Sequence, residues 1–129
     1  IIDGINQACA NAGDKPEARL RAVLNYWIDD LQSVETSVLF PEIWSLANLY
    51  GFAQATMARS YSHGLATLTK LIPPLNPQLP AEDIERIAKF MCAAMEGLTI
   101  FVGHEKMWSD DHTALKETAI ESFISLIRG

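Results

Sequence analysis

Basic residues are scarce in this sequence, and they are never clustered. Only ten of the 129 residues are Lys or Arg, against 16 Asp and Glu, and the formal net charge is −6. A surface that binds nucleic acid needs several neighbouring cations to neutralise successive phosphates. We therefore do not expect these residues to bind DNA or RNA by themselves.

Cysteines, long apolar runs and catalytic signatures are also scarce or missing. Cys9 and Cys92 lie far apart in helical patterns, which favours reduced thiols in the cytoplasm over a disulfide. No apolar run is long enough to span a bilayer, and no segment resembles a signal peptide. The sequence contains no Gly-rich phosphate loop and none of the HExxH, GxSxG or CxxC motifs. These absences predict a cytoplasmic protein that is not an enzyme, needs no cofactor and does not insert into a membrane.

One polar loop carries side chains that can bind a metal ion: His104, Glu105, Asp110, Asp111 and His112. A metal site needs such groups to converge on one point. Acidic residues at the start of a helix have a simpler use, because they interact favourably with the helix dipole. We therefore predict no metal site here.

Apolar residues recur at helical spacing between widely separated glycines and prolines, which predicts one all-α domain over residues 1–129. Residues 1–12 end one helix, with Ile1, Ile2 and Ile5 on its apolar stripe. Asp14 is the expected N-cap of the next helix, and Pro80 is the expected first residue of another. Further helices are expected over 15–32, from about 37 onward, over 52–72, over 81–103 and over 111–128, with the proline-rich 73–80 as a stiff linker. Gly64 within the third of these suggests a close neighbour.

The last two helices are too apolar for a surface position. The segment FMCAAMEGLTIFVG, residues 90–103, carries a single charge at Glu96, and the terminal helix is similarly apolar. A helix that meets only its own core needs a narrower apolar stripe. The pattern predicts that both helices also contact a second chain, most simply in a symmetric dimer. A larger core within one chain is the alternative.

The order of segments resembles the C-terminal regulatory domain of the TetR family of bacterial transcriptional repressors. The resemblance covers nearly the whole chain and rests on PEARL at 16–20, EIWSLA at 42–47, a long aromatic-bearing helix, the proline linker, MEGL at 95–98 and the apolar terminal helix. It implies a helical bundle whose last two long helices, within 81–129, form a four-helix bundle with a second copy. It also implies that 13–72 form a ligand pocket, and that 1–12 are the tail of a helix leading to an N-terminal helix-turn-helix head, which this sequence does not contain.

The resemblance further implies a mechanism of repression. A small-molecule effector changes the spacing of the two DNA-reading heads, which must match half-sites about 34–36 Å apart for a one-turn spacing. DNA would be contacted only through the missing heads. The sequence leaves open whether the ligand induces or corepresses.

Large or adaptable side chains on inward stripes are the candidate ligand contacts, and they favour a hydrophobic or aromatic ligand. These are Trp27, Trp44, Met57, Tyr61, Met91 and Met95. The candidate dimer contacts are Gly97, Phe101, Ile120, Phe123, Ile124 and Ile127. Gly97 would allow a close approach of another helix, although the pattern does not decide which flank of 81–103 faces the partner.

Two other functions are compatible with the pattern. A helical dimerisation module without a ligand would have a filled interior. A small all-α enzyme would need titratable groups facing inward, such as Arg59 together with Glu42.

Overall fold

The fold is an all-α helical bundle, as the sequence predicts. The structure is a computed structural model that describes residues 2–129, with side chains from residue 4 onward, so Ile1 and the side chain of Ile2 lie outside the described residues. Within this range the α-helices are α1 (Ile2–Asn11), α2 (Pro16–Asp30), α3 (Phe40–Ala47), α4 (Gly51–Leu71), α5 (Ala81–Val102) and α6 (His112–Arg128). Three short turns precede α3, α5 and α6: the π-helical η1 (Glu35–Leu39) and the 3-10 turns η2 (Pro73–Leu75) and η3 (Ser109–Asp111). None of the helices over 2–129 is both long and apolar enough to cross a membrane.

The long helices begin and end close to their predicted limits, but two capping predictions are wrong. Lys15, in an extended conformation, precedes α2, and no side chain caps that helix, so Asp14 is not its N-cap. Pro80 is the extended residue before α5 rather than its first helical residue. The residue before a proline is disfavoured in the α conformation, so Lys15 is extended and α2 begins at Pro16. Pro80 is itself extended, with a ψ of 156°, so α5 begins one residue later, at Ala81.

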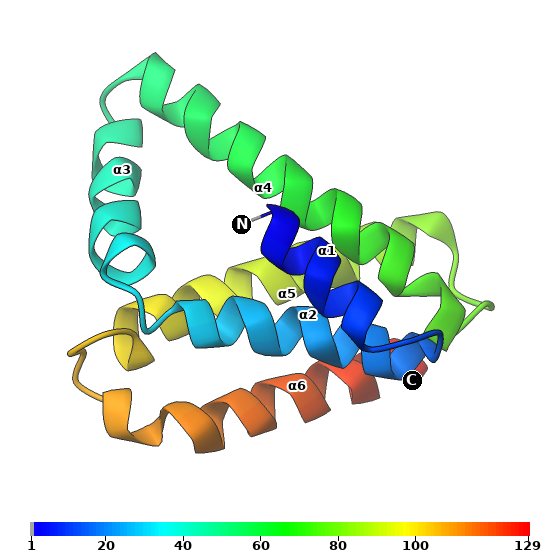
Figure 1. The fold of residues 1–129 in the computed structure, drawn as a ribbon. Helices are drawn as coiled ribbons and strands as arrows, with labels where there is room; N and C mark the ends of the chain where they lie inside the picture. Colours follow the sequence, from blue (N-terminus) through cyan, green and yellow to red (C-terminus); the bar gives the residue numbers. More distant parts are fainter. Residues whose placement is uncertain (1) are drawn as a thin grey trace.

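The main core lies between α2, α5, α6 and the C-terminal end of α4 (Figure 1). Its most deeply buried members include Leu20, Leu24 and Ile28 of α2, Leu68 of α4, and Met91 of α5. Burying each such side chain contributes about 1.5–3 kcal/mol relative to leaving it in water.

The burial of α6 corrects part of the predicted dimer interface. Ile120, Phe123, Ile124 and Ile127 are between 0% and 4% exposed in the single chain and belong to its own core. These side chains of α6 therefore pack against α2 and α5 of the same chain, whereas Leu126 of the same helix is 44% exposed. These four side chains offer no surface to a partner.

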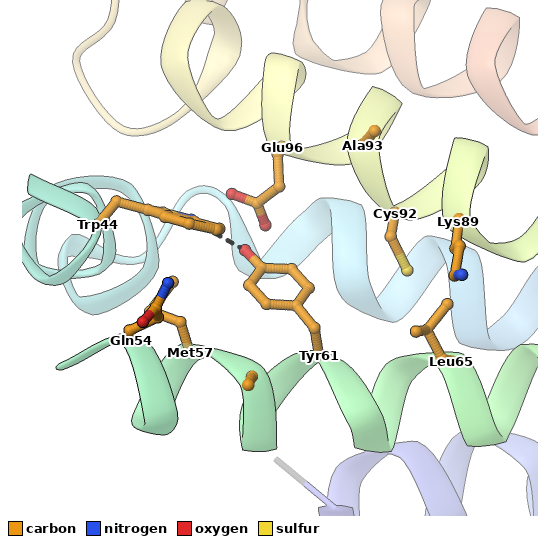
Figure 2. A pocket seen from close by; sticks show the side chains of 10 residues that line it. Trp44, Gln54, Met57, Tyr61, Leu65, Lys89, Cys92, Ala93 and Glu96 are labelled. Carbon is orange, nitrogen blue, oxygen red and sulfur yellow. Dashed lines mark hydrogen bonds between the residues drawn. The ribbon is translucent and has the colours of Figure 1, made fainter. Parts of the chain in front are cut away.

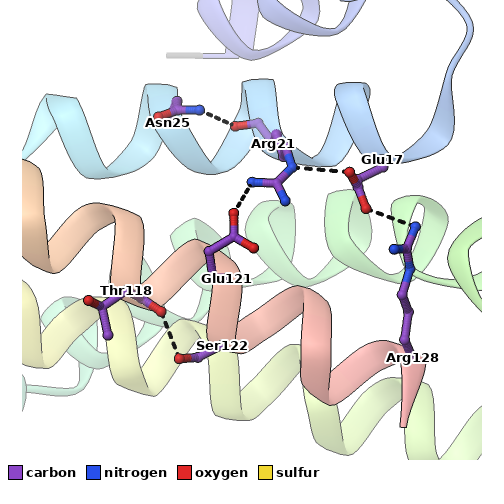
Figure 3. A network of polar contacts seen from close by, with 7 residues as sticks. All are labelled: Glu17, Arg21, Asn25, Thr118, Glu121, Ser122 and Arg128. Carbon is purple, nitrogen blue, oxygen red and sulfur yellow. Dashed lines mark hydrogen bonds and ion pairs between the residues drawn. The ribbon is translucent and has the colours of Figure 1, made fainter.

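Charged side chains also join α6 to α2. Arg21 Nη1 lies 2.6 Å from Glu121 Oε1, and Glu17 lies between Arg21 and Arg128, with its Oε1 2.8 Å from Arg128 Nη2 (Figure 3). At the other end of the pair, Lys116 Nζ donates to Asp29 Oδ1 at 2.8 Å. Exposed ion pairs contribute little to stability individually, so their main effect here is to set the register of α6 along α2.

The opposite side of the bundle is more open. The α4 helix diverges from α2 and α5 toward its N-terminal end, and α3 stands across the wide end (Figure 1). No residue of α3 is buried. The end of α5 is held at this side by Gly103, since a Cβ atom there would lie 2.7 Å from both Ser37 Cβ and the Thr99 carbonyl oxygen.

Candidate ligand-binding site

Two pockets lie where α4 diverges from α2 and α5. We call them the Trp27 pocket, with a volume of about 340 Å³, and the Lys89 pocket, of about 440 Å³. Side chains from α1, α2, η1, α3, α4 and α5 line the Trp27 pocket, and side chains from α3, α4 and α5 line the Lys89 pocket. Tyr61, Cys92 and Glu96 line both. These three side chains therefore form a common wall.

Tyr61 is held in this wall by aromatic neighbours. Trp44 Nε1 donates to the Tyr61 hydroxyl oxygen at 3.2 Å, and the two ring centroids are 5.7 Å apart. Phe40 meets the Tyr61 ring edge to face at 6.2 Å. Figure 2 shows the Tyr61 ring reaching from α4 into the space below α5, with its hydroxyl toward Trp44. Aromatic pairs of this kind favour a defined geometry, so α3 and α4 present an ordered aromatic surface.

Glu96 points from α5 toward Tyr61 and Trp44 (Figure 2). Burial raises the pKa of Glu96, and polar interactions with the Tyr61 hydroxyl and the Trp44 indole oppose this rise only in part. Burial, with the charge of Glu96 as a smaller cause, also raises the pKa of the Cys92 thiol, one helical turn away. Within residues 4–129 no Lys, Arg or His side chain forms a salt bridge with Glu96. The wall thus contains a partly desolvated carboxyl group without a cationic partner.

A second carboxylate lines the Trp27 pocket. The side chain of Asp30, in the last turn of α2, accepts a hydrogen bond from Thr36 Oγ1 at 2.5 Å. Thr36 belongs to the π-helical turn η1, and its backbone N–H donates to Ser33 Oγ at 3.2 Å. Short π-helical segments occur often at functional sites, because their extra residue redirects side chains. Here the turn places Thr36 against Asp30 at the edge of the pocket.

Five of the six residues predicted to contact a ligand line the pockets. Trp27 and Met95 line the Trp27 pocket, Trp44 and Met57 line the Lys89 pocket, and Tyr61 lines both. The sixth, Met91, is fully buried in the core and lines neither pocket. It lies one turn from Met95 on the same stripe, so periodicity alone could not separate core from pocket.

Gly64 corrects another expectation. A Cβ atom at Gly64 would meet only Cys92 Sγ, at 4.0 Å, so the glycine faces the Trp27 pocket rather than a close neighbour.

The sequence pattern predicted no ligand contact for Cys92, Asp30 or Glu96, which all line the Trp27 pocket. For Glu96 a signal existed, because it is the only charge in residues 90–103.

The remaining predicted interface residues lie on the outside of α5. Phe101 is 38% exposed and stacks on Trp108, with ring centroids 4.7 Å apart. A Cβ atom at Gly97 would meet nothing within 4 Å in the single chain. Phe90, on the same flank, is 56% exposed, whereas Ala88 on the opposite flank is fully buried. Only the flank with Phe90, Gly97 and Phe101 is therefore open to a partner.

The structure also places the polar residues that were considered for a metal site and for an enzyme. His112 Nε2 lies 3.2 Å from Asp29 Oδ1 on α2. The His112 side chain therefore points toward α2 and not toward the polar loop that contains His104. Among the residues that the structure describes, no three His, Cys, Asp or Glu side chains converge as a metal site would require. Arg59 and Glu42 are both exposed, so they do not form the inward pair that an enzyme would need.

Comparisons of the chain with protein-family models, with curated proteins and with solved structures return no match. The features of the molecule that bear on its function are therefore the two pockets and the exposed flank of α5.

Proposed function

We propose that this chain is the effector-binding and dimerisation domain of a cytoplasmic bacterial transcriptional repressor of the TetR type. The observation that carries the proposal is the Trp27 pocket, a space of about 340 Å³ within a helical bundle, lined by aromatic and apolar side chains with a few polar groups. Small-molecule sites have this volume and this composition. A dimerisation module without a ligand would instead be filled at this position.

The location of α1 suggests how a ligand acts. Ile5 of α1 lines the Trp27 pocket, and the pairing of α1 with α2 is close, since a Cβ atom at Gly4 would collide with the Tyr26 ring. In the proposed protein, α1 leads to the DNA-binding head. A ligand that prefers one position of α1 would shift the population of head spacings, and one with equal affinity for all positions would have no effect.

The pocket is tested with Nile red, a neutral dye whose emission increases in apolar surroundings. Gly64→Leu adds a side chain that extends into the Trp27 pocket, and Ala66→Leu adds the same side chain at an exposed position of the same helix. We expect the dye to bind the wild type and Ala66→Leu, and to lose most of its emission with Gly64→Leu. Equal emission from all three proteins would contradict a ligand pocket and favour the module without a ligand.

The homodimer is tested by analytical ultracentrifugation. Phe90→Glu places a charge on the exposed flank of α5 and disturbs no core contact in the single chain, because Phe90 is 56% exposed. We expect a dimer for the wild type and a folded monomer for Phe90→Glu, since a charge buried in an interface without a partner is costly. A wild-type monomer at micromolar concentration would refute the dimer.

A further inference from the structure

We propose that the Trp27 pocket binds a compact lipophilic organic cation, such as an aryl quaternary ammonium ion, between the carboxylates of Glu96 and Asp30 and the rings of Trp27, Phe40 and Tyr61. This inference rests on the proposed function, because it names the chemical class of the effector. It differs from the sequence-based expectation of a neutral hydrophobic or aromatic ligand by adding a positive charge.

The charges of the lining support a cation. Among the described residues, the Trp27 pocket is lined by two carboxyl side chains, Asp30 and Glu96, by the imidazole of His63, and by no Lys or Arg. In the described part of the chain neither carboxylate is in a salt bridge. Lys89 belongs to the neighbouring pocket, where its Nζ lies 2.7 Å from Glu85 Oε1. An anionic ligand would be repelled here, and a cation would supply the missing partner.

The aromatic lining favours a cation that is weakly hydrated. The faces of aromatic rings attract cations, most strongly where water is excluded, and quaternary ammonium ions are recognised in this way. Trp27, Phe40 and Tyr61 come from three different helices and line the same pocket. A small, strongly hydrated ion such as sodium would lose more hydration on entering than these rings return. The combination of rings and carboxylates therefore selects an organic cation.

Because Glu96 is partly buried, the affinity for a cation should also depend on pH. Burial raises the pKa of Glu96, so a cation beside it would stabilise the ionised form and bind more tightly as the pH rises through that pKa. The titratable groups that line the two pockets around Glu96 are Asp30 of α2, Tyr61 and His63 of α4, and Cys92 and Lys89 of α5.

The test compares two ligands of nearly identical shape by isothermal titration calorimetry. Phenyltrimethylammonium carries a permanent charge where its isostere tert-butylbenzene carries a neutral carbon. We expect the cation to bind the wild type at least about tenfold more tightly, a difference of about 1.4 kcal/mol. Equal affinity, tighter binding of tert-butylbenzene, or no binding of the cation would overturn the inference.

Matched variants locate the charge that is responsible. Glu96→Gln and Asp30→Asn keep the shape of each side chain and remove its charge, and each should reduce the preference for the cation. Glu82→Gln removes one charge from an exposed position of the same helix as Glu96, and should keep the preference. If Glu82→Gln reduces the preference as much as Glu96→Gln does, the attraction comes from the overall charge, and the inference is wrong.

The two proposals fail in different ways. If Gly64→Leu weakens the binding of tert-butylbenzene and Nile red, and phenyltrimethylammonium does not bind at all, the pocket is real and its ligand is neutral. If Nile red emission is insensitive to Gly64→Leu, the pocket itself is refuted.

Discussion

The two ends of α4 show how differently one helix is used. At its C-terminal end Leu68 is fully buried against α2 and α5, whereas near its N-terminal end Phe52 is 71% exposed. We call the first region, with α6 and the faces of α2 and α5 that pack against it, the packed half. The second region, with η1, α3 and the C-terminal half of α5, is the open half. Most of the large, fully buried side chains lie in the packed half, and the two pockets lie toward the open half.

The composition of α4 explains the difference. Its C-terminal third carries large apolar residues at helical spacing, Leu65, Leu68 and Leu71. Its N-terminal half is rich in Ala, Thr and Ser, with Ala53 and Met57 as the buried positions. The small side chains leave space between this half and α5, which Met57 and the aromatic residues of α3 and α4 close only in part.

The largest expected effect comes from cavities made in the packed half. Leu68→Ala should lower the free energy of unfolding by about 2–5 kcal/mol, because it removes fully buried methyl groups from a filled core. The matched change in the open half, Leu46→Ala, removes the same atoms from a side chain that is 43% exposed and should cost below about 1 kcal/mol. Urea denaturation of both variants measures the two values. Similar losses would show that the halves are equally packed.

Substitutions at two glycines should change the free energy of unfolding in opposite directions. Gly103→Ala should destabilise the protein by about 1–3 kcal/mol, because the new Cβ would lie 2.7 Å from Ser37 Cβ and from the Thr99 carbonyl oxygen. Gly64 faces the Trp27 pocket, where a Cβ atom has room. Gly64→Ala should therefore stabilise the helix by about 0.5–1 kcal/mol, because alanine loses less backbone entropy than glycine on folding. Thermal unfolding should therefore shift in opposite directions. Destabilisation by Gly64→Ala would mean that the pocket is narrower than described.

The smallest effect concerns the pH dependence of stability. Burial raises the pKa of Glu96 from its ordinary value of 4.5, so the folded protein binds more protons than the unfolded chain between that value and the raised one. Stability due to this group is therefore fully present below about pH 4.5 and is lost as the pH rises through the raised pKa.

Glu96→Gln should accordingly match the wild type at low pH and become more stable than it toward neutral pH, as measured by urea denaturation across the pH range. A constant difference between Glu96→Gln and the wild type at every pH would contradict a raised pKa.

The helices and much of the pocket could be predicted because they depend on local pattern. Helical spacing and proline positions located α2, α4, α5 and α6 closely, and five of six candidate ligand contacts line the pockets. Met91 and the four residues of α6 could not be assigned in this way. Periodicity identifies which side of a helix is apolar, but not whether the opposing surface belongs to the same chain, to a partner or to a pocket.

The sequence by itself determined the all-α class, the limits of the long helices and the unusual breadth of the apolar surface on α5, since these follow from residue spacing and backbone preference. Only the tertiary structure decided how that breadth is used. Ala88 and Met91 face the core, Cys92 and Glu96 face the pockets, and Phe90 and Phe101 remain outside. The physical reason is that burial depends on which helices pack together and how far they diverge. A single carboxylate in an apolar run becomes a candidate binding group only when α3 and α4 enclose it.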